Sequence, residues 1–259
     1  QSLREGVLEK CLRMGKLSEA LSGLQFLCSL DNMQTHADLI AGLQLYHLHE
    51  IFEDIRTLAE YRADEVQLES LKLLPGTDMR RRATELGIRF SPLPPYEVLQ
   101  TNEISTSELQ TARRLSRLLD AFYNTPAWQD LTRMLILQED DFLTRFLAYL
   151  TEGNLIDQPM SLEKRGLVLY EFCRKHYLAY QLDASIAWIE AGMSLKKQPA
   201  ERVKTKHQVP PESWTILNGS YRDNLRLCFL PTDEAGLHGY WFGFEADSQK
   251  ATPVFKAQT

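Results

Sequence analysis

The sequence lacks both a long hydrophobic run and an excess of basic residues. Its apolar stretches are short and interrupted by charges, so none reaches the roughly 18 residues that a membrane-spanning helix requires. Lys and Arg number 29 against 35 Asp and Glu, a formal net charge of −6 over 259 residues, whereas nucleic-acid-binding domains usually carry a basic excess. With 44% hydrophobic and 25% charged residues, the composition predicts a soluble globular protein that binds neither a membrane nor nucleic acid.

Cysteine is scarce and widely spaced. The four thiols are Cys11, Cys28, Cys173 and Cys228. Without CxxC or CxxxCxxC spacing they form neither a zinc ribbon nor a self-contained iron–sulfur site. A chain of this length can build its own core and does not depend on disulfides, so we expect reduced thiols and a cytoplasmic location.

Helical and strand patterns alternate over the first 90 residues. Apolar residues recur at three- and four-residue steps over 7–30, with a break near Gly15, which predicts two helical segments. The apolar runs 33–43 and 65–74 predict strands, and each precedes a helical pattern, 48–58 and 78–86 respectively. This order predicts βα units on a parallel sheet, with the functional face at the carboxyl ends of the strands.

The composition changes at the proline-rich segment 91–96, SPLPPY. Prolines fix their own φ and keep the preceding residue out of the helical region, which favours a rigid connector. We therefore expect two domains, residues 1–90 and residues 91–259. Helical periodicity over 105–123, 138–150, 161–177 and 182–195 predicts a mainly helical second domain, and the aromatic, alternating segments 224–229 and 239–244 predict antiparallel strands near its end.

Taken alone, the polar residues assign neither a catalytic residue nor a metal ligand. His36 lies near His47 and His49, but these two stand two positions apart on a predicted helix and face different ways, which favours surface or strand-end histidines over metal ligands. The run Arg80 to Arg82 can hold a phosphate or carboxylate, although a solvated face is the favoured interpretation. We interpret Asp140 and Asp141 as acids at a helix N-terminus and Trp241 as a core residue.

Four segments carry a resemblance to a known family. They are 36–43 (HADLIAGL), 71–77 (LKLLPGT), 91–99 (SPLPPYEVL) and 122–124 (FYN). Over about the first 135 residues the chain resembles radical S-adenosylmethionine (radical SAM) proteins with a cobalamin-binding domain, and especially the subgroup that ends in a domain of unknown function. The resemblance implies an α/β fold: the second half of a radical SAM (TIM-like) barrel over residues 1–90, then a mainly α-helical domain with a small β-rich C-terminal segment.

The resemblance also implies which residues bind S-adenosylmethionine. Gln1 and Ser2 match a segment at the end of the fourth barrel strand. By similarity to the related anaerobic coproporphyrinogen oxidase pattern, Gln1 is expected to contact the ribose. Arg13 is expected to hold the methionyl carboxylate, and Asp38 to accept hydrogen bonds from the ribose hydroxyls.

Four further residues are implied to lie around the adenine. Ile40 and Gly42 correspond to the motif of the fifth strand, where an apolar side chain packs on the base and a glycine allows close approach of the backbone. Leu71 and Leu73 are expected to pass near the adenine edge from the sixth strand. Packing in the strand core is an equally weighted interpretation for both leucines.

The chain departs from the family at two points. The family usually has a proline and an acidic residue after the Gly-Leu of the fifth strand, whereas this chain has Gln44-Leu45-Tyr46-His47, so we expect a turn of a different shape. The CxxxCxxC loop that binds the [4Fe–4S] cluster is also absent. The chain opens at Gln1 without an initiator Met or a signal-like segment, and we expect a truncated protein whose missing N-terminal part carries the cluster and cobalamin.

The resemblance therefore implies a fragment of a radical SAM enzyme. The full-length parent is expected to cleave S-adenosylmethionine reductively to a 5′-deoxyadenosyl radical and to act on a small-molecule substrate, with or without cobalamin, while this chain alone is expected to be inactive. The alternative is a non-catalytic helical binding or scaffold module that keeps a decayed barrel half. An incomplete barrel leaves an unpaired edge and apolar surface, so self-association is also expected.

Overall fold

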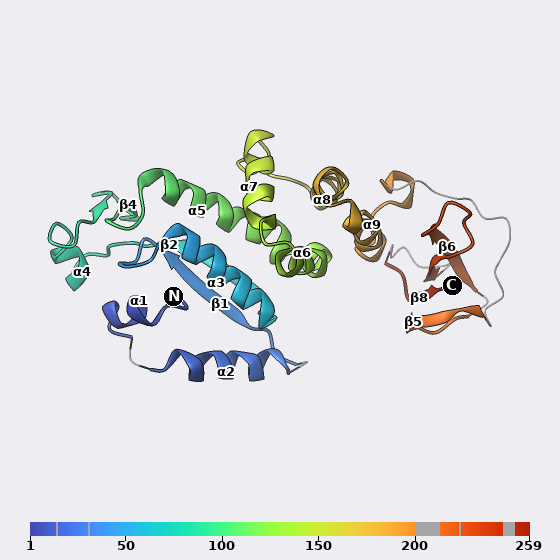
Figure 1. The fold of residues 1–259 in the computed structure, drawn as a ribbon, viewed down its shortest axis with the longest axis horizontal. Coiled ribbons are helices and arrows are strands. Elements are labelled where there is room, and N and C mark those ends of the chain that lie inside the picture. The colour runs from blue at the N-terminus through green and yellow to red at the C-terminus, as the bar shows by residue number, and fades with distance from the viewer. Residues whose placement is uncertain (14, 31, 200–212, 223, 246–251) are drawn as a thin grey trace. The chain divides into compact units, whose positions relative to one another are not determined.

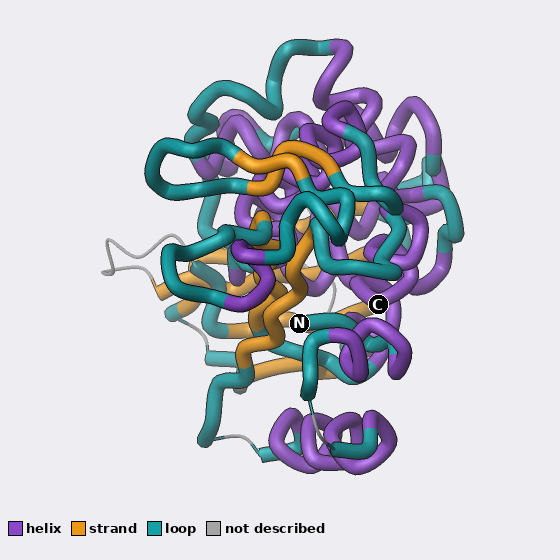
Figure 2. The backbone as a smooth tube through the Cα atoms, turned by 90° about the vertical axis from the view of Figure 1, so that its left-hand side faces the viewer, coloured by secondary structure: helices purple, strands orange, loops and turns teal. Residues whose placement is uncertain are grey.

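The fold is that of a computed structural model, which describes residues 1–259 apart from 14, 31, 200–212, 223 and 246–251. The chain divides into two compact units, residues 1–160 and 161–259, and helices and strands occur in both (Figure 1). Figure 2 distinguishes the helices, strands and loops along the backbone. The boundary predicted at residue 90 lies inside the first unit, and the division into domains at that point stays a prediction. Among the described residues, no helix is both long and apolar enough to cross a membrane.

The first unit begins with the predicted alternation of helices and strands. Its elements up to residue 81 are α1 (Glu5–Lys10), α2 (Leu17–Cys28), β1 (His36–Ala41), α3 (Leu48–Glu60), β2 (Glu65–Ser70) and α4 (Asp78–Arg81). The break predicted near Gly15 is confirmed, as is the parallel pairing: β1 and β2 run side by side with Leu39 opposite Leu68. Both leucines are buried, so one face of this small sheet belongs to the core.

The predicted strand 65–74 and the predicted helix 78–86 are both shorter than expected. The strand predicted over 65–74 ends at Ser70, because Lys72 forms an antiparallel bridge with Glu97 and the Leu73 amide donates to the Tyr96 carbonyl. The helix predicted over 78–86 has only the four residues of α4. The end of the proline-rich connector and the residue after it thus pair with the residues just beyond β2.

Helices dominate the rest of the first unit. The short strands β3 (Arg89–Phe90) and β4 (Val98–Gln100) pair antiparallel and precede α5 (Thr106–Leu118), the π-helical turn η1 (Leu119–Tyr123), α6 (Pro126–Gln138) and α7 (Phe142–Glu152). Ser105 caps α5 by accepting the Glu108 amide, and the Glu108 carboxylate accepts the Ser105 amide in return. Phe122 and Phe146 meet edge to face in the core.

The segment after η1 joins these helices to β2. The Tyr123 hydroxyl donates to the Ala63 carbonyl at 2.7 Å. The side-chain oxygen of Asn124 accepts the Val66 amide at 2.9 Å, and its side-chain nitrogen donates to the Val66 carbonyl at 3.0 Å. Asn124 therefore pairs with β2 as a neighbouring strand would, and residues on either side of position 90 share one compact unit.

In its described residues, the second unit combines the helices α8 and α9 with a sheet. Its elements are α8 (Leu162–His176), the 3₁₀ turns η2 (Leu178–Tyr180) and η3 (Leu195–Lys197), α9 (Gln181–Glu190), and strands β5 (Thr215–Gly219), β6 (Leu225–Pro231), β7 (Gly239–Glu245) and β8 (Phe255–Gln258). The strands form an antiparallel sheet in the order β5-β8-β7-β6, which confirms the predicted antiparallel strands. Trp241 is buried against Phe229, as a core residue.

The fold is thus a mixture of helices and small separate sheets. Within the described residues, parallel pairing between strands is confined to β1 and β2, and none of the sheets closes into a barrel. The mixed α/β class is confirmed at this level. The helix predicted to reach residue 195 ends at Glu190, because Gly192 takes a positive φ of 70° that does not continue a helix.

Candidate functional site

The open face of the β1–β2 sheet carries polar side chains. Side chains alternate between the two faces of a strand, so Asp38 and Ile40 lie opposite the face of the buried Leu39. Asp38 pairs in register with Gln67, and Ile40 with Glu69. Asp38 and Glu69 are exposed, and Ile40 and Gln67 are half-buried. This polar surface is the candidate site.

Gln1 extends the sheet on the side of β1 away from β2. The Ile40 amide donates to the Gln1 carbonyl at 2.9 Å, whereas Ala41 accepts the Leu71 amide on the β2 side. The Arg13 guanidinium donates to the side-chain oxygen of Gln1 at 3.2 Å. The Asp38 carboxylate and the Arg13 guanidinium both lie near the backbone nitrogen of Gln1. Gln1, Arg13 and Asp38 therefore lie close together, and their roles toward a ligand stay predictions.

Ser2 points away from this surface. It is 3% exposed, and its hydroxyl donates to the Asp54 carboxylate at 3.4 Å. Tyr46 and Arg4 contact the same carboxylate. No pattern in the sequence selects Asp54, although Tyr46 belongs to the segment in which the chain departs from the family that it resembles.

Two of the residues expected around the adenine, Gly42 and Leu73, are buried, whereas Ile40 and Leu71 are half-buried. Gly42 is buried with φ 96°, and a β-carbon on it would lie 3.5 Å from both Leu71 and Val98. Leu73 is 1% exposed, and its carbonyl accepts the Arg80 guanidinium at 2.8 Å. Leu73 is thus a core residue that lies beyond the end of β2, and the positive φ alone is a reason for glycine at position 42.

The histidines and arginines considered above have structural partners. His47 lies just before α3, and its ring stacks on that of His49 with centroids 5.6 Å apart, so the prediction that these two histidines face different ways is wrong. His47 also lies within hydrogen-bond distance of the Glu103 carbonyl. The Arg80 guanidinium lies over the rings of Phe90 and Tyr96. In the part of the chain that the structure describes, no group of three or more His, Cys, Asp or Glu side chains is arranged to hold a metal ion.

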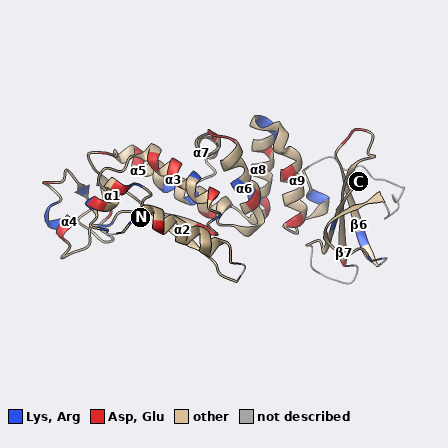
Figure 3. Cartoon of the chain, turned by 60° about the horizontal axis from the view of Figure 1, so that its bottom comes forward, with Lys and Arg blue, Asp and Glu red and all other residues tan. Residues whose placement is uncertain are grey.

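Charged residues singled out in the sequence also form ion pairs within the chain. Arg82 pairs with Glu85 at 2.8 Å, and Asp140 pairs with Arg56 at 2.9 Å. Acidic and basic side chains are interspersed along the helices (Figure 3). Arg81 and Arg82 are exposed, as the interpretation of the arginine run as a solvated face expects, whereas Arg80 is half-buried against Phe90 and Tyr96 and does not fit it.

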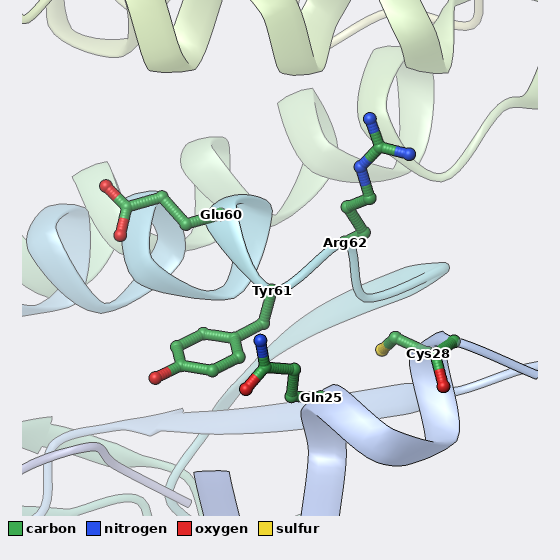
Figure 4. A pocket seen from close by; sticks show the side chains of 6 residues that line it. Gln25, Cys28, Glu60, Tyr61 and Arg62 are labelled. Carbon is green, nitrogen blue, oxygen red and sulfur yellow. The ribbon is translucent and has the colours of Figure 1, made fainter. Parts of the chain in front are cut away.

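A separate cleft of about 600 Å³ lies where α2 and α3 end. Figure 4 shows side chains that line this cleft, among them Tyr61 and Gln25. Its lining residues are Gln25, Cys28, Ser29, Glu60, Tyr61 and Arg62. Because β2 begins just after this point, the cleft is at the amino end of the strands and is distinct from the candidate site.

In comparison with known protein families, one region of the chain matches a family model. Residues 84–193 match the sequence model of a family described as a protein of unknown function, DUF4080. The match includes the segment PPYEVL and the segment FYN, and it leaves β1, β2 and the C-terminal sheet outside. A search of curated proteins gives no match.

Proposed function

We propose that this chain is part of a radical SAM enzyme and that the open face of the β1–β2 sheet binds S-adenosylmethionine. The observation that carries the proposal is the meeting of Gln1, Arg13 and Asp38 beside β1. A guanidinium suits the methionyl carboxylate, and an aspartate accepts hydrogen bonds from paired ribose hydroxyls. Parallel βα units commonly bind ligands toward the carboxyl ends of their strands, and Ile40 is the penultimate residue of β1.

In this proposal β1 and β2 are the fifth and sixth strands of a barrel that further chain would complete. The region matched as a protein of unknown function, residues 84–193, supports the proposal because the family resemblance expects a domain of unknown function from about residue 91. The role of this chain is to bind and orient the nucleoside and methionyl groups and to exclude water around them. A location in the cytoplasm and a small-molecule substrate remain part of the proposal.

The chain itself does not fit an iron–sulfur cluster. Such a cluster needs several cysteine thiolates that lie close together. Here Cys11 and Cys28 lie in the first unit and are 17 positions apart, and Cys173 and Cys228 lie in the second unit and are 55 positions apart. Cluster chemistry, and any cobalamin, therefore belong to another part of the proposed parent. Without the cluster we expect this chain to bind S-adenosylmethionine weakly and to show no activity.

Titration of the 259-residue chain with S-adenosylmethionine tests the proposal. Amide chemical shifts should change in residues 1–13 and in β1. Arg13→Gln and Asp38→Asn should each weaken binding at least about tenfold, because one hydrogen bond to a charged group contributes roughly 1.5–3 kcal/mol. Arg82→Gln, in an exposed ion pair outside the site, is the matched control and should leave the affinity unchanged. Equal affinity in all variants, or shifts confined to other segments, contradicts the proposal.

One observation favours the non-catalytic alternative. Gly42 and Leu73 pack against residues of the chain itself, as they would in a helical scaffold with a decayed barrel half. The same titration discriminates between the two functions, because a scaffold should show no shifts in β1 at millimolar ligand.

A further inference from the structure

A buried carboxylate on α3 connects two segments that flank the candidate site. Asp54 is 1% exposed. One carboxylate oxygen accepts the Tyr46 hydroxyl at 2.6 Å and the Leu3 amide at 2.8 Å, and the other accepts the Arg4 guanidinium at 2.9 Å. We call the residues Ser2, Leu3, Arg4, Tyr46 and Asp54 the Asp54 cluster.

The cluster joins the residues just after Gln1 to the turn that follows β1. Leu3 and Arg4 lead directly into α1. Tyr46 lies in the unusual turn beyond Gly42, next to Leu45 with its positive φ of 61°. One carboxylate therefore fixes both the approach of Gln1 to the sheet and the turn by which the chain leaves β1.

Burial makes these contacts consequential. A buried charge is costly unless hydrogen bonds and an opposite charge compensate it, and here Asp54 accepts from the Ser2 and Tyr46 hydroxyls, the Leu3 amide and the Arg4 guanidinium. Burial, followed by the adjacent Asp54 carboxylate, raises the pKa of Tyr46, so the phenol remains a donor at neutral pH. Tyr46 is 0% exposed, and water cannot easily replace its hydroxyl.

We propose that Asp54 and Tyr46 are positioning residues that hold Gln1 in register with β1 and thereby place Arg13 beside Asp38. The geometry supports this directly, because Gln1 contacts β1 through one backbone hydrogen bond to Ile40 and Arg13 contacts the Gln1 side chain. If residues 2–4 are released, Gln1 is no longer fixed beside Ile40. The consequence for S-adenosylmethionine rests on the proposed function, whereas the register itself does not.

Hydrogen exchange at single amides tests the register. In Tyr46→Phe and Asp54→Asn, exchange of the Ile40 amide should accelerate at least about tenfold, because its acceptor is Gln1. The Leu71 amide donates to Ala41 on the other side of β1 and should be unaffected. Glu53→Gln is the matched control: Glu53 also binds Arg4, at 2.7 Å, but is 60% exposed, and exposed ion pairs contribute little. Its effect on Ile40 should stay below about threefold.

The affinity for S-adenosylmethionine provides the second measurement. It should fall at least about tenfold in Tyr46→Phe and remain unchanged in Glu53→Gln. Unchanged Ile40 exchange in Tyr46→Phe overturns the inference, as does equal acceleration at Ile40 and Leu71, which indicates general destabilisation. Tyr46→Phe decides the outcome if Asp54→Asn does not fold. Selective acceleration at Ile40 in a chain that binds no S-adenosylmethionine supports the register and refutes the proposed function alone.

Discussion

Replacing Asn124 by alanine should destabilise the first unit by about 2–4 kcal/mol. The Asn124 side chain makes two hydrogen bonds to the backbone of Val66, which is 0% exposed. Each bond contributes about 1 kcal/mol net, and a buried backbone group left without a partner costs about 1–3 kcal/mol. Because the β2 backbone near Val66 can relax partly after the substitution, the total loss of stability should stay within about 2–4 kcal/mol.

Asn124→Asp refines the prediction because it keeps the shape and changes the hydrogen-bonding groups. The new carboxylate can accept the Val66 amide but faces the Val66 carbonyl and the Asp120 carboxylate, to both of which Asn124 now donates. These neighbours should raise the folded-state pKa of the new carboxyl above the unfolded value of about 3.9. The loss relative to the wild type should therefore be complete at pH 7 and shrink as the pH falls through that raised pKa, where the neutral carboxyl can donate again.

Native-state hydrogen exchange of peptides from β1 and β2 measures the unfolding free energy of this unit separately from residues 161–259. Gln110→Ala removes a side-chain amide from an exposed position of α5 and should change stability by less than about 0.5 kcal/mol. If Asn124→Ala is as stable as Gln110→Ala, the pairing of Asn124 with β2 does not stabilise the unit. A loss in Asn124→Asp that stays constant down to pH 3 refutes the electrostatic reasoning.

Three further predictions concern backbone strain and buried groups. Gly87→Ala should lower the free energy of unfolding by about 1–2 kcal/mol in urea denaturation, because φ is 66° and the new β-carbon would lie 2.3 Å from the Asn102 side chain. Gly23→Ala in α2 should raise it by about 0.5–1 kcal/mol, because the new β-carbon meets nothing within 4 Å. A Gly87→Ala protein more stable than Gly23→Ala contradicts this prediction. Burial raises the pKa of Tyr123 to about 12, above the unfolded value of about 10, so its contribution to stability is complete below pH 10 and is lost between pH 10 and 12. Stability curves of Tyr123→Phe should lack that loss, and parallel curves would disprove it. Burial also raises the pKa of Cys173 to about 12. Iodoacetamide at pH 8 should therefore alkylate the half-buried Cys28 well before the buried Cys173. Equal alkylation rates of the two thiols, followed by mass spectrometry, would contradict this prediction.

Local patterns in the sequence were sufficient for most elements of the first 60 residues. The separation of α1 from α2 follows from Gly15, whose φ of 142° suits glycine, and β1 and α3 follow from their apolar spacing. The helix α6 was missed. Its first residue, Pro126, is a helix breaker in the interior but is well suited to the first turn, where its missing N–H has no helical acceptor.

Contacts distant in sequence could not be predicted in this way. Asp54 accepts a hydrogen bond from Ser2, which is 52 positions away in the sequence, and Asn124 accepts one from Val66, which is 58 positions away. The spacing of apolar residues in the sequence does not indicate which residues form such long-range pairs. Gln1, Arg13 and Asp38 were selected through the family resemblance, and the structure brings them together. The contacts proposed to position them involve Tyr46, which lies where the chain departs from the pattern of that family.

The side-chain pairing of Asn124 also determines the direction in which the small sheet can grow. Asn124 occupies the outer edge of β2 near its start, and the bridge between Lys72 and Glu97 follows just beyond its end. A strand from another chain would have to displace these contacts to add there, so this edge is protected against intermolecular pairing. The side of β1 where Gln1 lies is the opposite edge, and any additional strand, from the same protein or a partner, would extend the sheet in that direction.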